Sequence, residues 1–236
     1  MIMKRRIIAL LCAGCLFSLT ACQEDIEITE VPMPPVEEEP EPAPDDTDKI
    51  YECEHPLLLT EQAQGRILIV DADTRETLWE WRAASAADMP DATSLMRLPS
   101  EVKAIYNRRY ILATASGGGV ALIRIADKKA MFYAKPGGNP HSAEVLPDGN
   151  VVVASSTGNL LSVYVYNGAD SYVSRPAFTM PVHSAHNVVW DRKRGCLWTA
   201  TGAQLLKLAY NGKRTAPELT QVRSYDMAAG NTDAHD

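Results

Sequence analysis

A repeat of short β-hairpins constrains the fold of this chain more than any other feature. Residues 142–154 hold two β-rich runs around Pro147-Asp148-Gly149-Asn150, a turn sequence that favours a hairpin. Similar hairpins cover residues 102–114 and 184–200. The copies therefore recur at a period of about 40 to 45 residues, which is the range of propeller blades.

A second hairpin follows each copy. It covers residues 120–133 in one period, and begins with residues 160–166 and 205–210 in the next two. Residues 57–81 supply the corresponding strands of an earlier period. Four short strands per period are typical of a β-propeller blade. We therefore predict an all-β fold, a β-propeller of four-stranded blades over residues 49–236.

The length of this region fits about four to five blades. Its last residues, Thr232-Asp233-Ala234-His235-Asp236, resemble the openings of the earlier blades at residues 141–144 and 183–186. Propellers close with four to eight whole blades. We therefore expect a truncated propeller that is incomplete at its C-terminus.

Residues 1–21 have the pattern of a bacterial lipoprotein signal peptide. Lys4-Arg5-Arg6 precedes an apolar run over residues 7–17, and Leu19-Thr20-Ala21 precedes Cys22. The run is shorter than the roughly 20 residues that a membrane-spanning helix needs. We predict cleavage before Cys22 and lipidation of Cys22, so that the membrane is a partner through a lipid anchor. This predicts an outer-membrane lipoprotein of the cell envelope.

Residues 22–48 are predicted to form a disordered, acidic and proline-rich tether. From Gln23 to Asp48 there are eleven acidic residues, six prolines and no Lys or Arg, a composition that cannot form a packed core. From Lys49 onward, 20 basic residues nearly balance 19 acidic ones. This balance gives no electrostatic case for nucleic-acid binding.

The first residues of the tether, Gln23-Glu24-Asp25, resemble the export signals of Bacteroidota surface lipoproteins. The resemblance implies exposure on the cell surface. The alternative is that these residues only begin the acidic tether.

Two cysteines follow the tether, Cys53 and Cys196. An oxidising compartment would allow them to form a disulfide, but their spacing does not determine pairing. The apolar neighbours of Cys196 favour a buried thiol. Neither cysteine lies in a motif that would lower the pKa of its thiol, so we predict no cysteine catalysis.

A family resemblance rests on the order of these segments. The lipoprotein signal, the acidic tether, and blades with His-Ser-Ala-Glu and Pro-Asp-Gly-Asn resemble uncharacterised β-propeller lipoproteins of Bacteroidota, a domain-of-unknown-function family. Residues 71–79 are also similar to the quinoprotein repeat, although Arg75 stands where that repeat has glycine. We interpret Trp79 as packing between blades. Trp190-Asp191 ends a first strand, which does not match the position of this dipeptide in the WD repeat.

Superposing the blade openings brings several polar residues together. Glu144, His186 and His235 take one position, with Lys103 near it in the preceding blade, while His141 and His183 lie three residues earlier. Residues that enter the first strand of a blade lie near the central channel. The superposition thus predicts a polar ring at the axis, where titratable groups would converge.

Three interpretations of this ring stay open. Its side chains would hydrogen-bond one blade to the next, hold a ligand such as a divalent metal, or act as acids and bases. No cofactor is predicted otherwise. The favoured function is a lipid-anchored binding or scaffold module for a glycan, peptide or protein partner. The alternative is a propeller hydrolase, lyase or transferase that uses the axial His residues.

Overall fold

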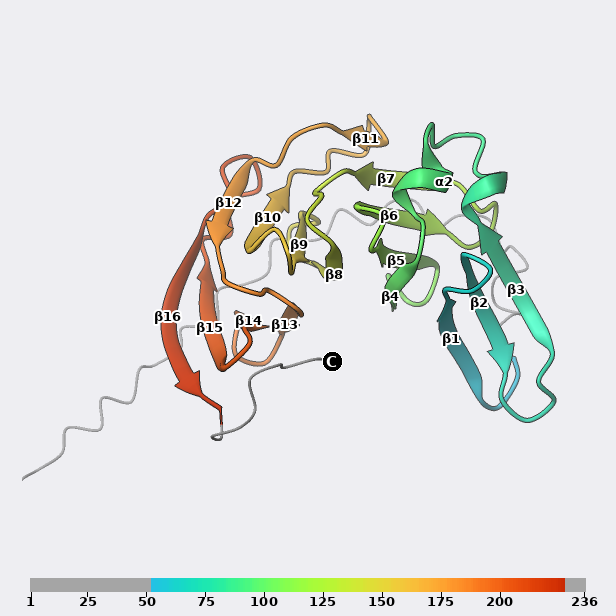
Figure 1. The fold of residues 1–236 in the computed structure, drawn as a ribbon, viewed down its shortest axis with the longest axis horizontal. Coiled ribbons are helices and arrows are strands. Elements are labelled where there is room, and N and C mark those ends of the chain that lie inside the picture. The colour runs from blue at the N-terminus through green and yellow to red at the C-terminus, as the bar shows by residue number, and fades with distance from the viewer. Residues whose placement is uncertain (1–51, 228–236) are drawn as a thin grey trace, which may run out of the picture.

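The computed structural model describes residues 52–227, which fold into four mainly antiparallel β-sheets. The sheets follow one another in chain order along an arch that is open on one side (Figure 1). This succession of twisted antiparallel sheets around an axis confirms the predicted β-propeller blades. The signal peptide, Cys22, the whole tether and His235 lie outside the described residues.

Each sheet is built from strands that follow one another in the chain, except that one short strand from the third repeat joins the second sheet. The first contains three, β1 (Pro56–Glu61), β2 (Arg66–Asp71) and β3 (Thr77–Arg82). The second contains β4 (Pro99–Ile105), β5 (Tyr110–Ala115), β6 (Gly119–Arg124) and β7 (Ala130–Ala134), with the short β11 (Tyr172–Val173) at its outer edge. The third contains β8 (Pro140–Val145), β9 (Val151–Ser155), β10 (Leu160–Tyr164) and β12 (Phe178–Pro181). The fourth contains β13 (Val189–Asp191), β14 (Cys196–Ala200), β15 (Gln204–Tyr210) and β16 (Leu219–Asp226).

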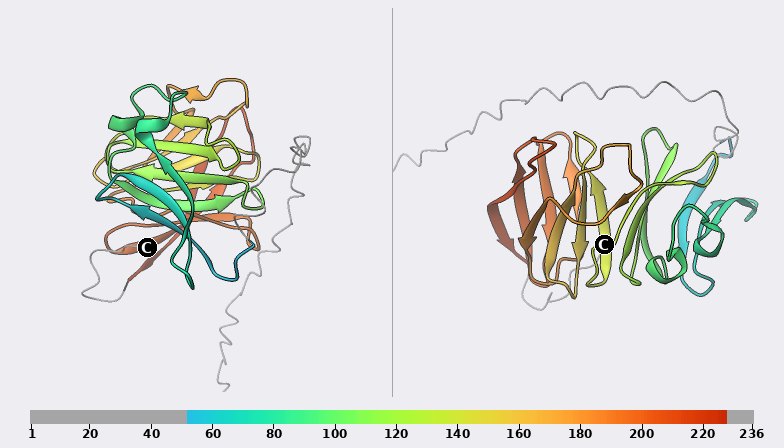
Figure 2. Two further views of the ribbon diagram at one scale, coloured as in Figure 1. Left: turned by 90° about the vertical axis from the view of Figure 1, so that its right-hand side faces the viewer. Right: turned by 90° about the horizontal axis from the view of Figure 1, so that it is seen from above.

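The sheets stack face to face, so their middle strands are buried on both sides (Figure 2). Every residue of β9 is buried, and β6 is buried except at Arg124. This explains why these strands are continuous apolar runs without the polar alternation of a half-exposed strand. The core is therefore a series of apolar layers between neighbouring sheets.

Trp79 has the packing role expected from the sequence. Its side chain is 5% exposed, and its indole Nε1 donates a hydrogen bond to the Ile125 carbonyl in the next sheet at 3.0 Å. Trp81 makes the same kind of bond to the Lys128 carbonyl at 3.2 Å. Both tryptophans thus join the first sheet to the second.

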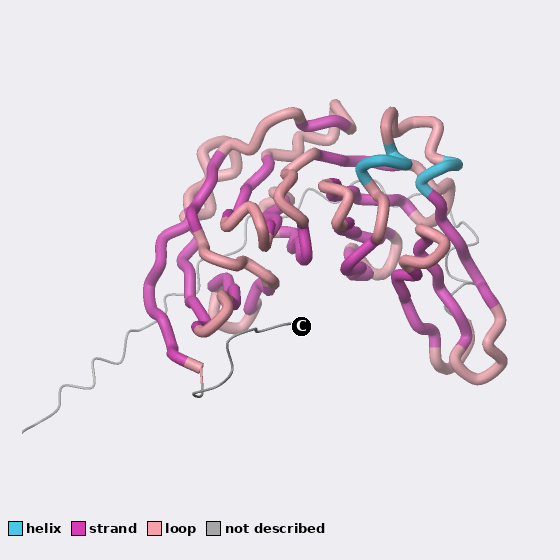
Figure 3. The backbone as a smooth tube through the Cα atoms, viewed as in Figure 1, coloured by secondary structure: helices cyan, strands magenta, loops and turns pink. Residues whose placement is uncertain are grey.

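Helix is almost absent from the described residues (Figure 3). The 3-10 turn η1 (Ala83–Ser85) and the four-residue helix α2 (Ala92–Leu95) lie in the connection between the first two sheets. Gly117 packs so closely on this connection that an added Cβ would lie 2.4 Å from the Ser94 carbonyl oxygen. In residues 52–227 no helix has the length and apolar character needed to cross a membrane.

One connection differs from the expected hairpin. The sequence predicts a tight return after Asn167-Gly168, but the chain runs outward through β11 before it forms β12. The Asn167 side chain accepts the backbone N–H of Ala169 and Asp170, which makes a local turn. β11 then pairs in parallel with β7 of the preceding sheet, so the detour adds a link between two blades.

The first sheet lacks an innermost strand among the described residues. β4 contacts β1 and β2 in the way that β8 contacts β5 and β6. β1 therefore occupies the second position of its blade, as β5 does.

The two cysteines do not pair in the structure. Both thiols are free, and Cys196 is 3% exposed whereas Cys53 is half-buried. Burial raises the pKa of the Cys196 thiol. The expectation of a buried thiol at Cys196 is confirmed.

Candidate functional site

Lys103 on β4 links three successive sheets on the concave side of the arch. Its Nζ donates to the Ala143 carbonyl at 2.8 Å and to the Val188 carbonyl at 2.9 Å. Ala143 belongs to β8, and Val188 directly precedes β13. The side chain is 23% exposed, so these bonds are largely shielded from water.

Two carboxylates complete this network. Glu101 accepts the Ser142 hydroxyl at 2.9 Å and the Ala143 N–H at 3.0 Å. Glu144 accepts the Trp190 N–H at 3.4 Å. The Lys103 Nζ lies 3.3 Å from a Glu101 oxygen and 3.8 Å from a Glu144 oxygen. These polar side chains therefore hydrogen-bond neighbouring blades, because each pairs with the inner strand of an adjacent sheet.

The strand pairing corrects the superposition of the blade openings. Glu144 on β8 pairs with Val152 on β9, and Trp190 on β13 pairs with Leu197 on β14. Val152 and Leu197 hold the same place in their strands, because the turns that follow the two strands have the same length. Glu144 and Trp190 thus occupy matching positions.

This match leaves His186 four residues before the position that Glu144 takes in its own blade. The letters His-Ser-Ala occur in both blades four residues out of structural register. The prediction that Glu144 and His186 are equivalent was therefore wrong, because strand pairing sets the register.

His141 and His186 do lie together. Their ring centroids are 5.0 Å apart with the planes at 60°. Asn139 Nδ2 lies 2.9 Å from His141 Nε2, and an amide nitrogen can only donate, so this Nε2 accepts. His186 Nδ1 lies 2.9 Å from the Ser184 carbonyl, so this Nδ1 carries a proton. The two imidazoles come from adjacent blades and form a pair at the entrance to their inner strands.

His183 lies elsewhere. It is exposed and lines a cavity of about 450 Å³ with Pro181, Thr201, Gln204 and Gln221, between the β12–β13 connection and the fourth sheet. Among the described residues, the predicted ring thus separates into the Lys103–Glu144 pair, the His141–His186 pair and His183.

Away from the axis, residues 52–227 contain one group of three side chains close enough together to hold a metal ion. It consists of Glu54, His55 and Asp73, all exposed. His55 Nδ1 lies 2.8 Å from an Asp73 oxygen. Binding of a divalent metal at the axial residues stays a prediction. Such a site would need at least one further ligand beside His141 and His186.

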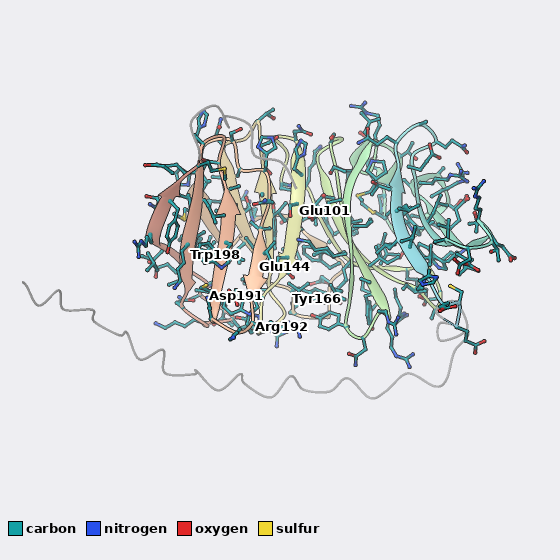
Figure 4. All side chains as sticks on the ribbon, turned by 90° about the horizontal axis from the view of Figure 1, so that it is seen from below. Glu101, Glu144, Tyr166, Asp191, Arg192 and Trp198 are labelled. Atoms are coloured by element: carbon teal, nitrogen blue, oxygen red, sulfur yellow. The ribbon has the colours of Figure 1, made fainter. Side chains whose placement is uncertain are left out.

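A groove on the concave side brings together residues that the sequence analysis missed. We call it the axial groove. It has a volume of about 490 Å³, and its functional lining consists of Lys103, Tyr106, Arg108, Glu144, Trp190 and Arg192. Figure 4 looks into the open side of the arch, where Glu101, Glu144 and Arg192 come from three successive sheets.

The turn that forms one wall of this groove has an unusual backbone. Tyr106, Asn107 and Arg108 have φ values of 48°, 54° and 64°. The corresponding turns of the next two blades place glycine at positive φ, with 86° at Gly149 and 57° at Gly195. A left-handed conformation costs a residue with a Cβ about 1–2 kcal/mol, and such strain is concentrated at functional sites. In the sequence, the absence of glycine from the Asn107-Arg108-Arg109 turn could have indicated this strained wall of the groove.

The comparisons with known proteins give a family and distantly similar solved structures. The model of a family described as "Family of unknown function (DUF6528)" matches residues 3–236. Among solved structures, dihydro-heme d1 dehydrogenase NirN in complex with DHE is similar, with 18% identity and a TM-score of 0.49. The match covers 71% of this chain and 35% of NirN, so the chain spans about a third of that protein's length. No curated protein matches the sequence.

Proposed function

Because the chain belongs to the DUF6528 family, whose description names no activity, we propose its function from its geometry: a non-enzymatic binding module of the cell envelope. In this proposal, lipid on Cys22 holds the protein at the outer membrane. The ligand binds in the axial groove.

The observation that supports this function is the composition of the groove. Three successive sheets contribute to it, and its outer part contains exposed Tyr106, Arg108 and Arg192. The groups suited to acid–base chemistry, Lys103 and Glu144, are hydrogen-bonded or ion-paired within the protein. A groove whose ionisable groups join the blades, while its aromatic and guanidinium groups face solvent, favours recognition over proton transfer.

The tether fits this role. A proline-rich chain extends by about 3.1 Å per residue, so residues 22–48 would reach about 80 Å from the lipid. Repulsion between the eleven acidic side chains favours extension. The groove would thus meet ligands away from the membrane surface.

The His141–His186 pair favours a second candidate, a hydrolase, lyase or transferase. One nitrogen of each ring is assigned a definite role by its hydrogen bond, accepting in His141 and donating in His186. A ring nitrogen that accepts beside a ring nitrogen that donates could act as base and acid. The enzymatic alternative therefore requires substrate turnover that depends on His186.

The test uses the full chain and a panel of neutral, carboxylated and sulfated oligosaccharides together with acidic, neutral and basic peptides. We expect one class to raise the melting temperature of the wild-type protein and to be recovered unchanged by mass spectrometry. Ala104→Trp, which fills the groove at an exposed lining position, should abolish this effect. Ala177→Trp, at an exposed position outside the groove lining, is the matched control and should preserve it.

Two results would contradict the proposal. The first is the absence of stabilisation by every class in the panel. The second is conversion of a panel member to product with loss of that conversion in His186→Ala, which would establish the enzymatic alternative.

A further inference from the structure

Building on the proposed function, we infer that the ligand of the axial groove is an anionic sugar, a pyranose ring that carries a carboxylate or sulfate group. The charge of the groove, its aromatic rings and the state of its backbone groups support this ligand class.

The first argument is charge. The lining has three cations, Lys103, Arg108 and Arg192, against the single carboxylate of Glu144. Lys103 is matched by Glu144 and by Glu101 at 3.8 and 3.3 Å, so the exposed Arg192 is the main source of positive potential in the groove. The region from Lys49 onward is nearly neutral overall, so this potential is local. Guanidinium groups bind carboxylate and sulfate-like oxyanions through two parallel N–H···O bonds.

The second argument is the placement of aromatic rings beside these cations. Tyr106 is 41% exposed, and an edge-to-face contact with Tyr110 holds its ring at a centroid distance of 5.5 Å. Trp190 is half-buried and packs edge-to-face against Tyr210 at 6.4 Å. Rigid rings with an apolar face and a polar edge suit the C–H face and hydroxyl rim of a pyranose.

The third argument excludes an extended peptide bound by strand addition. That mode needs free backbone N–H and C=O groups along a sheet edge. Within the groove, the N–H groups of Val145 and Trp190 are bonded to the Glu144 carboxylate at 3.1 and 3.4 Å. Next to the groove lining, the N–H and carbonyl groups of Ala143 and Val188 are bonded as well. Side chains must therefore supply most of the recognition.

The fourth argument is preorganisation. The strained turn holds Tyr106, Asn107 and Arg108 at one wall of the groove, so less ordering entropy is lost on binding. Asn107 adds an amide that can both donate to and accept from sugar hydroxyls. The groove volume of about 490 Å³ lies within the range of small-molecule sites.

The test is calorimetric titration of the full chain with trigalacturonate, N-acetylglucosamine 6-sulfate, cellotriose and hexaglutamate. We expect binding of the carboxylated or the sulfated sugar, and whichever binds more tightly identifies the anionic group. Tyr106→Ala and Arg192→Gln should each weaken that binding about tenfold or more, the loss of roughly one good contact. Tyr172→Ala and Arg175→Gln change exposed residues outside the groove lining and should leave binding unchanged.

The melting temperature of each variant confirms that the fold is kept. Equal affinity for cellotriose would overturn the inference, as would groove-dependent binding of hexaglutamate in place of the sugars. In both cases the groove still binds a ligand, so the proposed function stands and only the ligand class fails. If no class binds, both fail.

Discussion

Replacing Lys103 by Met tests whether the polar network on the concave side holds the blades together. The change removes the donor that joins the Ala143 and Val188 carbonyls at 2.8 and 2.9 Å. It also leaves Glu101 and Glu144, which are 17% and 18% exposed, without their nearest cation. Met retains the aliphatic length, so the change isolates the ammonium group.

The expected cost follows from these contacts. A hydrogen bond from a charged group contributes about 1.5–3 kcal/mol, and the partial exposure of the site reduces this through screening. Two such bonds and two poorly solvated carboxylates predict a loss of about 2–4 kcal/mol in the free energy of unfolding. For a domain of this size that is a fall of about 5–15 °C in melting temperature.

The assay is thermal and urea unfolding at pH 7, followed by circular dichroism. Lys193→Met is the matched control, because Lys193 is exposed on a surface turn, and it should stay within about 0.5 kcal/mol of wild type. A double-mutant cycle with Glu101→Gln should show coupling of about 0.5 kcal/mol or more. A loss below about 1 kcal/mol for Lys103→Met would refute the argument that this side chain joins the blades.

Three further predictions concern other parts of the chain. Gly117→Ala should destabilise the protein by about 1–3 kcal/mol, measured by urea unfolding, because its Cβ would meet backbone oxygen at 2.4 Å; unchanged stability would contradict this packing. The hydrogen bonds from Arg124 lower the pKa of Asp127 below its usual value of 3.8. The ionised Asp127 therefore stabilises the fold above that pH, and this stabilisation is lost as the pH falls through the lower pKa of the folded state. Asp127→Asn should therefore flatten the decline in melting temperature below about pH 4, whereas Asp170→Asn, at an exposed loop position, should not. Finally, Cys22→Ser should move the protein from the membrane fraction to the soluble fraction; soluble wild-type protein that retains its N-terminus would disprove lipidation.

Much of the blade structure could be predicted because it depends on local chemistry. The Asp148-Gly149 turn lies between β8 and β9 as expected, and the Tyr110–Thr114 run is contained in β5. β-branched and aromatic runs favour strands, and glycine accepts the positive φ of the turn. The detour through β11 was missed because it depends on pairing with β7, a strand far away in the sequence.

The candidate site was predicted less well, and the reason is register. Lys103 and Glu144 were recognised as polar residues near the axis, and the structure places them 3.8 Å apart. The match between Glu144 and His186 failed because equal letters in two blades were taken as equal positions. A shift of four residues changes which side chains meet, and only the strand pairing in the folded sheets shows the correct alignment.

The sequence by itself determined the repeating strands, the turns between them and the predicted address of the chain, because hydrophobic runs, turn residues and a signal pattern act over a few neighbouring residues. The tertiary structure decided which repeats face each other. It brought His141 to His186, engaged Lys103 between three sheets, and formed a groove from Tyr106 and Arg192. These juxtapositions arise from the stacking of separate sheets, and no local preference of the chain encodes the distance between residues that lie 40 or more positions apart.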